Sequence, residues 1–353
     1  MQTKILEKIC CPVDKNKLEL IVFNVHPKKY KDIEIEEVLN GVLLSKTGWM
    51  YPIVDGVPRM HLNAFLEYEE FLTANYKDFG NKKASILSNY SYVLKDVLRK
   101  TKKTRKSFGQ EWKIFRYEQD TTWGFTKEVR KERFLKELGV DAEYLKSKIL
   151  IDVGCGNGVL TSGISEFGME TYGIDVSQSV ERAYYYNDNS NAHYLQADLQ
   201  NPPFKIASAD IVYSTGVLHH TNNTELSFSC ISPLVKTNGR LYIWLYRPEK
   251  DFRHNFLITL RKFTNKMPIW MQYAFYLTFL VPQGLLKEKL RGKKITWREQ
   301  LINYFDVLSC EFRYEHTPEE VKVWYAKRNF NNLNITIEEY LGFGMYGDLN
   351  KIP

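Results

Sequence analysis

Short apolar, β-branched runs alternate with polar segments of helix length between about residues 108 and 248. The runs are KILIDVG, METYGID, AHYLQAD, ADIVYST and GRLYIWLY. Runs of this length are typical of buried strands, and strands separated by helices form βαβ units with parallel pairing. A further helix, capped at Thr317-Pro318-Glu319-Glu320, precedes one more strand candidate, LNITIEEY. The pattern therefore predicts an α/β fold built on a parallel sheet.

The first 62 residues follow a different pattern of short strands and turns. KLELIVF and GVLLS predict strands, and Asp55-Gly56 predicts a turn. Residues 63–107 are helix-like and end in a basic run from Arg99 to Lys106. We interpret this run as part of a solvated linker, with phosphate binding as the alternative. The chain is thus expected to divide into a mostly-β unit (1–62), a helical basic linker (63–107) and an α/β domain (108–353).

A long insertion at about 249–312 interrupts the α/β alternation. It follows the fifth strand, on the side of the sheet where such folds bind ligands, so we expect a helical cap over the substrate. Its aromatic residues suggest contact with an apolar or lipid-linked acceptor, and the basic KEKLRGKKITWR suggests contact with an anionic membrane surface. Packing between cap and core is the alternative. The aromatic residues are Trp270, Tyr273, Phe275, Tyr276 and Phe279.

Part of this insertion, Met267 to Leu286, contains no charged residue and is long enough to span a bilayer. It also contains Gln272, Gln283, Gly284 and two prolines. Because it interrupts one sheet, whose neighbouring strands cannot lie on opposite sides of a membrane, we do not expect a single span.

Composition adds few constraints. The 353 residues carry 49 basic and 42 acidic side chains, a net charge of +7, which permits anionic partners but does not favour nucleic acid. The five cysteines are scattered and do not form a disulfide framework, and MQTKILEKICCPVD lacks the features of a signal peptide. We therefore expect a cytoplasmic protein; its oligomeric state is left open.

The stretch ILIDVGCGNGVLTSGI carries the clearest chemical signal. A buried strand leads into Gly154, Gly156 and Gly158, and these glycines permit a tight turn beside a ligand at a helix N-terminus. A dinucleotide fold would require glycine at position 159, which is Val159 here. Asp175 ends the next strand, where a carboxylate can accept hydrogen bonds from a ribose. Asp198 ends the third strand and completes an expected adenosine cradle.

The ordered motifs DVGCGNG, YGIDVS, QADL, ADIVYSTGVLHHT and LVKTNGRLYIW resemble those of class I S-adenosylmethionine-dependent methyltransferases, nearest the ubiquinone and menaquinone biosynthesis subgroup. The resemblance covers roughly residues 145–246. It implies a Rossmann-like seven-stranded sheet, S-adenosylmethionine as the cofactor, no metal, and methyl transfer to a small or lipid-linked metabolite. The cofactor residues that it implies are Asp152, Gly154, Cys155, Gly156, Asn157, Gly158, Asp175, Val176, Ala197, Asp198, Leu199, Ser214, Thr215 and Gly216.

Catalytic groups are less clearly marked. Methyl transfer depends largely on positioning, and a base is needed only when the acceptor carries a proton. His219, His220 and His316 are the candidate bases, because imidazole titrates near neutral pH. Tyr314 and Tyr246 are candidates for orienting the acceptor. Capping or solvation is the alternative role for each histidine.

Two other segments lie near the expected site. SFGQEWKIFRYEQ places Gly109, Gln110 and Trp112 where an N-terminal lid would cross the cofactor, with helix packing as the alternative. The NPPF segment at 201–204 looks like a signature of amino-group methyltransferases. It follows the third strand instead of the fourth, so we interpret it as a turn.

Residues 5–60 resemble a short zinc-ribbon-like family that includes an activator of RNA and protein-factor methyltransferases. The resemblance rests on ILEKICCPVDKNKLEL and TGWMYPIVDGVPRM. At the family's four cysteine positions this chain has Cys11, Asp14, Leu44 and Thr47, which argues against tetrahedral zinc and favours a metal-free docking module.

This second resemblance and the basic linker leave methylation of RNA or a translation factor as an alternative function. A non-catalytic scaffold that binds the cofactor is a further alternative.

Overall fold

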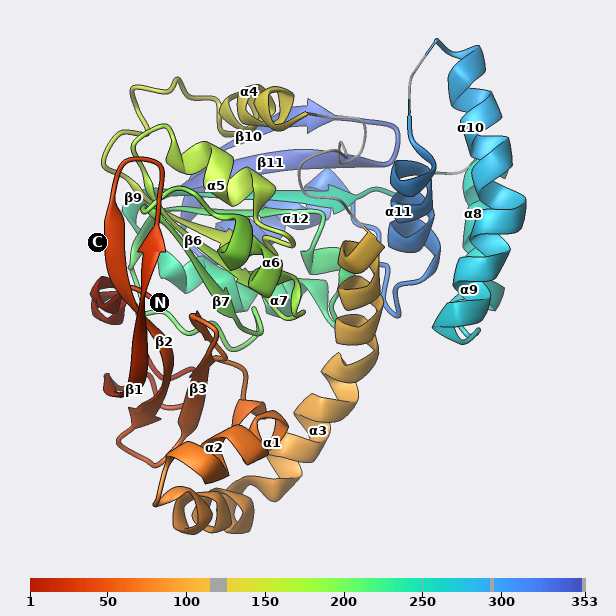
Figure 1. The fold of residues 1–353 in the computed structure, drawn as a ribbon. Coiled ribbons are helices and arrows are strands. Elements are labelled where there is room, and N and C mark those ends of the chain that lie inside the picture. Colours follow the sequence, from red (N-terminus) through yellow and green to blue (C-terminus); the bar gives the residue numbers. More distant parts are fainter. Residues whose placement is uncertain (115–125, 250, 293–294, 351–353) are drawn as a thin grey trace.

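The computed structural model describes residues 1–114, 126–249, 251–292 and 295–350, with backbone only at 100–114 and 253. It contains a four-stranded sheet near the N-terminus and a seven-stranded sheet in the larger domain (Figure 1). The small sheet is antiparallel, with its strands in chain order. Its strands are β1 (Leu18–Lys29), β2 (Glu34–Ser45), β3 (Met50–Val54) and β4 (Val57–Pro58). The strands expected at KLELIVF and GVLLS are therefore confirmed.

The seven-stranded sheet has the order β10-β11-β9-β8-β5-β6-β7. Strands β5 to β9 pair in parallel, whereas β11 runs antiparallel to both of its neighbours. This arrangement confirms the expected Rossmann-like seven-stranded α/β fold. Its strands are β5 (Ile149–Val153), β6 (Glu170–Asp175), β7 (Ala192–Gln196), β8 (Ala209–Thr215), β9 (Val235–Tyr246), β10 (Phe330–Glu338) and β11 (Gly342–Leu349).

Neighbouring residues of a strand point to opposite faces of the sheet, and both faces carry apolar side chains. Helices cover both faces. One apolar cluster joins Leu150 and Ile211 to α4 (Lys127–Leu138) and α5 (Val159–Ser165). A second cluster joins Ile151 and its neighbours to the opposite layer. Further helices of the domain are α6 (Ser179–Tyr186), α7 (Thr224–Ile231) and α12 (Pro318–Ala326).

The linker region forms α1 (Ala64–Glu67), α2 (Glu69–Asn75) and α3 (Phe79–Ile114). Helix α3 continues past residue 107, where we expected a boundary, and contacts the cap helix α11 (Trp297–Leu308) (Figure 1). A boundary placed at residue 107 would therefore cut a continuous helix.

The insertion after β9 is helical, as expected. It comprises α8 (Phe252–Thr264), α9 (Ile269–Phe275), a π-helical turn η4 (Tyr276–Leu280), α10 (Val281–Leu290) and α11. The uncharged stretch is thus divided between α9, η4 and α10. No helix within the described residues combines the length and the apolar character that crossing a bilayer requires.

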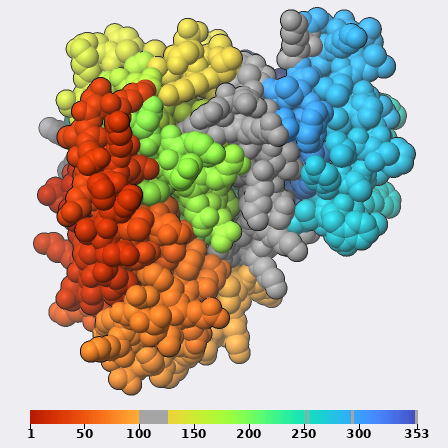
Figure 2. Space-filling view, in the orientation of Figure 1, coloured from red at the N-terminus to blue at the C-terminus, as the bar shows by residue number. Residues whose placement is uncertain are grey.

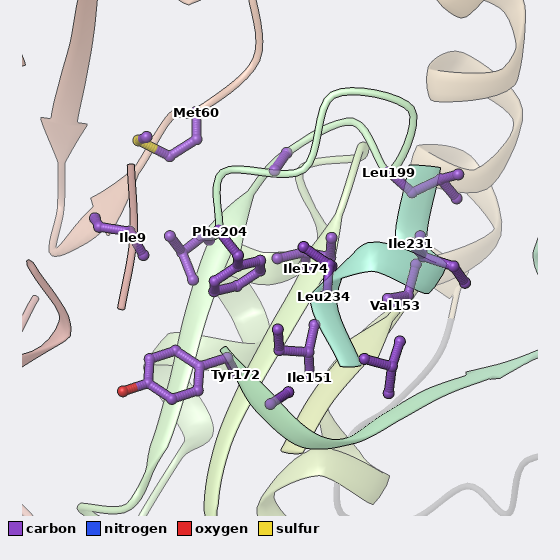
Figure 3. Packing of buried hydrophobic residues seen from close by; sticks show 14 of the residues in the cluster. Ile9, Met60, Ile151, Val153, Tyr172, Ile174, Leu199, Phe204, Ile231 and Leu234 are labelled. Carbon is purple, nitrogen blue, oxygen red and sulfur yellow. The ribbon is translucent and has the colours of Figure 1, made fainter. Parts of the chain in front are cut away.

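The N-terminal unit packs against the β7 edge of the large sheet. Met60 N donates to Gln196 O at 2.7 Å, and Cys10 N donates to Pro203 O at 2.9 Å. Figure 3 shows Ile9 and Met60 beside Phe204, which is fully buried. The 201–204 segment therefore helps to hold the two units together in one continuous core.

Candidate active site

The loop after β5 can form only with glycine at key positions. Gly154, Gly156 and Gly158 all have positive φ, of 82°, 56° and 74°. A Cβ on Gly154 would lie 2.3 Å from a Val217 methyl carbon, and one on Gly158 would lie 2.6 Å from the Ala183 Cβ. The loop therefore brings its backbone closer to its neighbours than any side chain would permit.

Asp152 and Asp175 lie beside this loop. Asp152 is buried, and its Oδ2 accepts a hydrogen bond from the Thr161 hydroxyl at 2.6 Å. Burial raises the pKa of Asp152 to about 6. The carboxylate of Asp175 accepts from Gly156 N at 3.1 Å and from the Ser177 backbone N and hydroxyl at 2.8 and 2.6 Å. Burial also raises the pKa of Asp175.

These three donors occupy three of roughly four lone-pair positions on the Asp175 carboxylate. One position remains for a ligand hydroxyl without rearrangement. Binding both hydroxyls of a ribose therefore requires one of the three existing hydrogen bonds to be released.

The residues expected around the adenine follow β6 and β7. Ala197 N donates to Asp175 O at 2.9 Å, which fixes the ends of these strands together. Val176 O accepts from the Gln196 side chain at 3.1 Å, and Asp198 Oδ1 accepts from Gln200 N at 2.9 Å. Leu199 is nearly buried in the large core, so most of its side chain packs inward.

Three further residues expected at the cofactor, Cys155, Asn157 and Ser214, have different surroundings. The Cys155 sulfur lies against Gly173, where an added Cβ would be 2.9 Å away. Asn157 is buried, and its Nδ2 has no hydrogen-bond partner in the described part of the chain. Ser214 is fully buried and donates to Val153 O at 3.0 Å, so it stabilises the sheet.

Thr215 and Gly216 lie at the carboxyl end of β8 and open into a cavity of about 540 Å³. Gly216 has a φ of 74°, and a Cβ built there would meet no atom within 4 Å. The cavity lies between α4, the ends of β8 and β9, α11 and the β10–β11 turn. Its lining residues are Arg130, Arg133, Glu137, Leu160, Tyr213, Thr215, Gly216, Trp244, Tyr246, Asn303, Asp306, Val307, Glu339, Tyr340 and Leu341.

One wall of the cavity carries an ionic network from α4. Arg133 donates to Glu137 at 2.8 Å and to Glu339 at 2.6 Å, and Glu137 also accepts from the Tyr213 hydroxyl. Arg130 lies one helical turn before Arg133, and burial lowers the pKa of its guanidinium. The wall thus combines aromatic surface with fixed charges.

The opposite wall comes from the cap. Tyr246 donates its hydroxyl hydrogen to Asp306 Oδ2 at 2.8 Å, and Asp306 Oδ1 lies 3.7 Å from His220 Nε2. Burial raises the pKa of Tyr246 well above its ordinary value, so this hydroxyl remains a donor. Trp244 Nε1 and Asn303 Oδ1 have no hydrogen-bond partner among the described residues, so a bound molecule can satisfy them.

The predicted catalytic residues lie around the cavity, but of these only Tyr246, expected to orient the acceptor, is among the described residues that line it. His219 and His220 are buried behind Tyr246, and burial lowers the pKa of both. The Tyr314 hydroxyl donates to Asn222 O at 3.3 Å. His316 pairs with Glu320 at 3.0 Å and packs against Trp324.

The sequence interpretation missed the polar groups that do face the cavity. On α11, Asn303, Asp306 and Val307 have the i, i+3, i+4 spacing of one helix face. On α4, Arg130, Arg133 and Glu137 follow a similar spacing. A search for polar residues at helical spacing in these segments could have found both sets. The expected lid side chains, Gly109, Gln110 and Trp112, lie outside the described side chains.

Residues 151–243, 93 of the 353 residues, match the family described as Methyltransferase domain. Over 102 residues the chain is 29% identical to a Ubiquinone biosynthesis O-methyltransferase of Azoarcus sp. (strain BH72), covering 28% of this chain and 44% of that protein. Over 192 residues it is 25% identical to Phosphoethanolamine N-methyltransferase 2 of Caenorhabditis elegans, covering 51% and 42%. The chain thus spans less than half the length of these relatives.

Among solved structures, the chain is similar to a magnesium protoporphyrin IX methyltransferase from Synechocystis PCC 6803 with bound SAH. That comparison has a TM-score of 0.40 and 16% identity, and it covers 70% of this chain and 98% of the other. The family match and the strand order of the seven-stranded sheet together support a methyltransferase domain of the class I, S-adenosylmethionine-dependent type at residues 151–243.

Proposed function

We propose that the protein transfers a methyl group from S-adenosylmethionine to a small or lipid-linked metabolite bound in the 540 Å³ cavity. The observation that carries this proposal is the position of Thr215 and Gly216. They line the cavity, and the family resemblance places the methyl donor beside them. The names of the relatives, which concern ubiquinone biosynthesis and phosphoethanolamine, support a small-molecule acceptor.

The residues present fit this cofactor. The space beside Gly216 is open, Asp175 retains one accepting position, and Asp198 lies beyond the end of β7. Asp152, with Gly154 to Gly158, would hold the methionine part. Asp175 would hold the ribose, and Asp198 with Leu199 the adenine. When bound, the cofactor supplies a methyl group on a sulfonium that an in-line nucleophile can displace.

For an acceptor that loses a proton, the described cavity wall offers Asp306 as the base. Its carboxylate faces the cavity from the cap, and Tyr246 holds it in place by a hydrogen bond. The acceptor's O–H or N–H bond would break, its proton would pass to Asp306, and its lone pair would form the new bond to the methyl carbon. Enclosure by the aromatic walls would exclude water from this step.

Once Asp306 has taken up a proton, His220 would accept a hydrogen bond from it on the side away from the acceptor. Its Nδ1 lies 2.9 Å from Phe312 O, and donation there leaves Nε2 without a hydrogen, facing Asp306 across 3.7 Å. Burial lowers the pKa of His220, so its ring is neutral before the reaction. When Asp306 takes the acceptor's proton, Asp306 can share that proton with His220 Nε2. This arrangement gives His220 a positioning role instead of contact with the acceptor.

We further propose that the N-terminal unit is a metal-free docking module derived from a zinc-ribbon-like fold. Asp14 and Thr47, at two of the expected ligand positions, are hydrogen-bonded to each other. Cys11, at a third, lies 3.2 Å from the Tyr51 hydroxyl. These contacts occupy the positions where a metal would need free ligands.

Calorimetry with S-adenosylmethionine tests the proposal first, comparing the native chain with Asp175→Ala. We expect micromolar binding that the substitution abolishes. Transfer of labelled methyl to a catechol with an alkyl tail then probes the acceptor cavity, with Asp306→Asn as the matched variant. Failure of the native chain to bind the cofactor would overturn the proposal.

A further inference from the structure

The outer surface of the cap is unusually apolar. Exposed large apolar side chains occur on α8, on α9, on the π-turn and on α10, where a helical cap of a globular protein would normally be polar. Phe252 and Leu290 are 84% and 80% exposed. The exposed members are Phe252, Phe256, Phe263, Trp270, Met271, Leu277, Phe279, Leu286 and Leu290, and we call them the cap face.

The phenylalanines of α8 lie on one side of that helix. At 100° per residue, Phe252, Phe256 and Phe263 fall within about 40° of one another. The inner side of α8 carries Leu257 and Leu260, which pack with α11 residues such as Phe305. Helix α8 is therefore apolar over a wide arc of its surface, and only part of that arc is covered.

Helix α10 repeats this arrangement. Val281 and Leu285 pack with the cap core, while Leu286 and Leu290 are exposed. Helices α8 and α10 both contact α11, and Figure 1 draws them on its outer side, away from the sheet. In the space-filling view the cap helices project as a lobe from the rest of the molecule (Figure 2).

Positive charge is concentrated in the same segment. Residues 252–298 contain ten basic residues and one acidic residue, a net charge of +9. The remaining residues carry 39 basic and 41 acidic side chains, a net charge of −2. Lys262, Lys266 and Lys289 are exposed beside the apolar residues. The positive net charge of the whole chain therefore arises from residues 252–298.

We propose that the cap face docks onto the surface of an anionic lipid bilayer. Exposed phenylalanine, leucine and tryptophan side chains can enter the boundary between headgroups and acyl chains, and the surrounding lysines and arginines can contact anionic headgroups. A second copy of the chain fits less well, because its contact would bring two segments of net charge +9 together. RNA also fits less well, because its bases would stack only on the aromatic members of the cap face, whereas a bilayer also accommodates the four aliphatic ones, Met271, Leu277, Leu286 and Leu290.

The docking surface is one helix layer away from the acceptor cavity. Helix α11 packs Phe305 and Leu308 toward the outer cap helices and turns Asn303 and Asp306 toward the cavity. Docking itself does not depend on the proposed methyl transfer. If that function holds, a membrane-resident acceptor would reach the cavity from the cap side.

Sedimentation with vesicles tests the proposal. We expect the chain to bind vesicles of phosphatidylcholine with about 30 mol% phosphatidylglycerol, and to bind pure phosphatidylcholine weakly. Replacing Phe256, Phe263 and Trp270 together by serine should reduce the partition coefficient at least about tenfold. A charge variant, Lys262→Glu with Lys266→Glu and Lys289→Glu, should lose the preference for anionic vesicles. The matched control is Tyr185→Ser with Ile206→Ser, two exposed apolar side chains outside the cap, which should change nothing.

Three results would overturn docking on a bilayer: full vesicle binding by the triple serine variant, self-association of the native chain without vesicle binding, or RNA binding without vesicle binding. S-adenosylmethionine calorimetry on the triple serine variant separates the two proposals. Its cofactor affinity should equal that of the native chain, whereas failure of the proposed methyl transfer would show in the native chain itself.

Discussion

The Tyr246 hydroxyl donates a hydrogen bond to Asp306 across 2.8 Å and thereby links the end of β9 to the cap helix α11. Each residue contributes to the wall of the same cavity, although 60 positions separate them in the chain. The cap thus supplies the carboxylate that Tyr246 holds at this wall of the cavity, and replacing either residue should have a measurable effect.

Asp306→Asn should lower kcat for a hydroxyl acceptor about 100-fold or more, because the amide cannot take the acceptor's proton. The substitution preserves the size of the side chain, and its carbonyl oxygen can still accept the Tyr246 hydrogen bond. Cofactor affinity should therefore stay unchanged in calorimetry, while turnover of labelled methyl falls. Tyr246→Phe should lower kcat less, since it removes the hydrogen bond that holds the carboxylate but leaves the carboxylate in place. Equal turnover by native enzyme and Asp306→Asn would exclude Asp306 as the base.

Cofactor affinity should rise as the pH increases from 5 to 7. Burial raises the pKa of Asp152 to about 6, and only its ionised form can attract the ammonium group of the methionine part. Below pH 6 the dissociation constant should change by up to tenfold per pH unit, and above pH 7 it should be flat. Calorimetry across this range, with Asp152→Asn as a weak-binding and pH-independent control, measures the effect.

The contribution of Asp152 to protein stability should fall as the pH rises, whereas cofactor affinity should increase. The folded chain keeps a proton on Asp152 that the unfolded chain releases at lower pH, so this residue's contribution to the free energy of unfolding falls between about pH 4 and pH 6. The full fall amounts to at most about 3 kcal/mol. Urea denaturation at several pH values measures the free energy of unfolding of the native chain and of Asp152→Asn. If this free energy changes with pH equally in both, the pKa of Asp152 in the folded chain is not raised.

The parts of the candidate site that are local in sequence could be placed from the sequence. The glycine loop, Asp152 and Asp175 lie at strand ends, where the chemistry needs particular residues at fixed spacing. Asp306, the proposed base, was not found, because its position at the cavity depends on how α11 packs against β9. Strand β11 was also not recognised from its residues. Its glycines, such as Gly344, against which the Tyr242 hydroxyl packs, permit close packing but weaken the strand pattern.

A matched pair of glycine substitutions separates backbone strain from steric overlap. Gly158 and Gly216 both have a φ of 74°, but an added Cβ meets Ala183 at 2.6 Å in the first case and open space in the second. Gly216→Ala should cost about 1 to 2 kcal/mol of unfolding free energy from strain alone. Gly158→Ala should cost clearly more and abolish cofactor binding. Urea denaturation and calorimetry compare the two, and equal costs would contradict the role assigned to the overlap.

The contact between the N-terminal unit and the large domain should stabilise the cofactor site as well as the fold. Arg59 is almost fully buried, donates to Gln196 at 3.1 Å and pairs with Glu181 of α6 at 2.9 Å. The Gln196 side chain in turn donates a hydrogen bond to Val176 O. Gln196 also directly precedes Ala197, which is expected beside the adenine. Arg59→Met keeps most of the side-chain volume but leaves Gln196 without this donor, and should cost about 2 kcal/mol of unfolding free energy.

The same variant should bind S-adenosylmethionine more weakly, since the end of β7 loses its support. Lys31→Met provides the control at the same interface. Lys31 is half exposed and pairs with Glu166 and Asp188 at the surface, so its removal should change stability by no more than about 0.5 kcal/mol. Thermal denaturation and calorimetry on both variants measure the two effects. A stability loss in Arg59→Met without any loss of cofactor affinity would show that the N-terminal unit supports the fold but not the adenine end of the site.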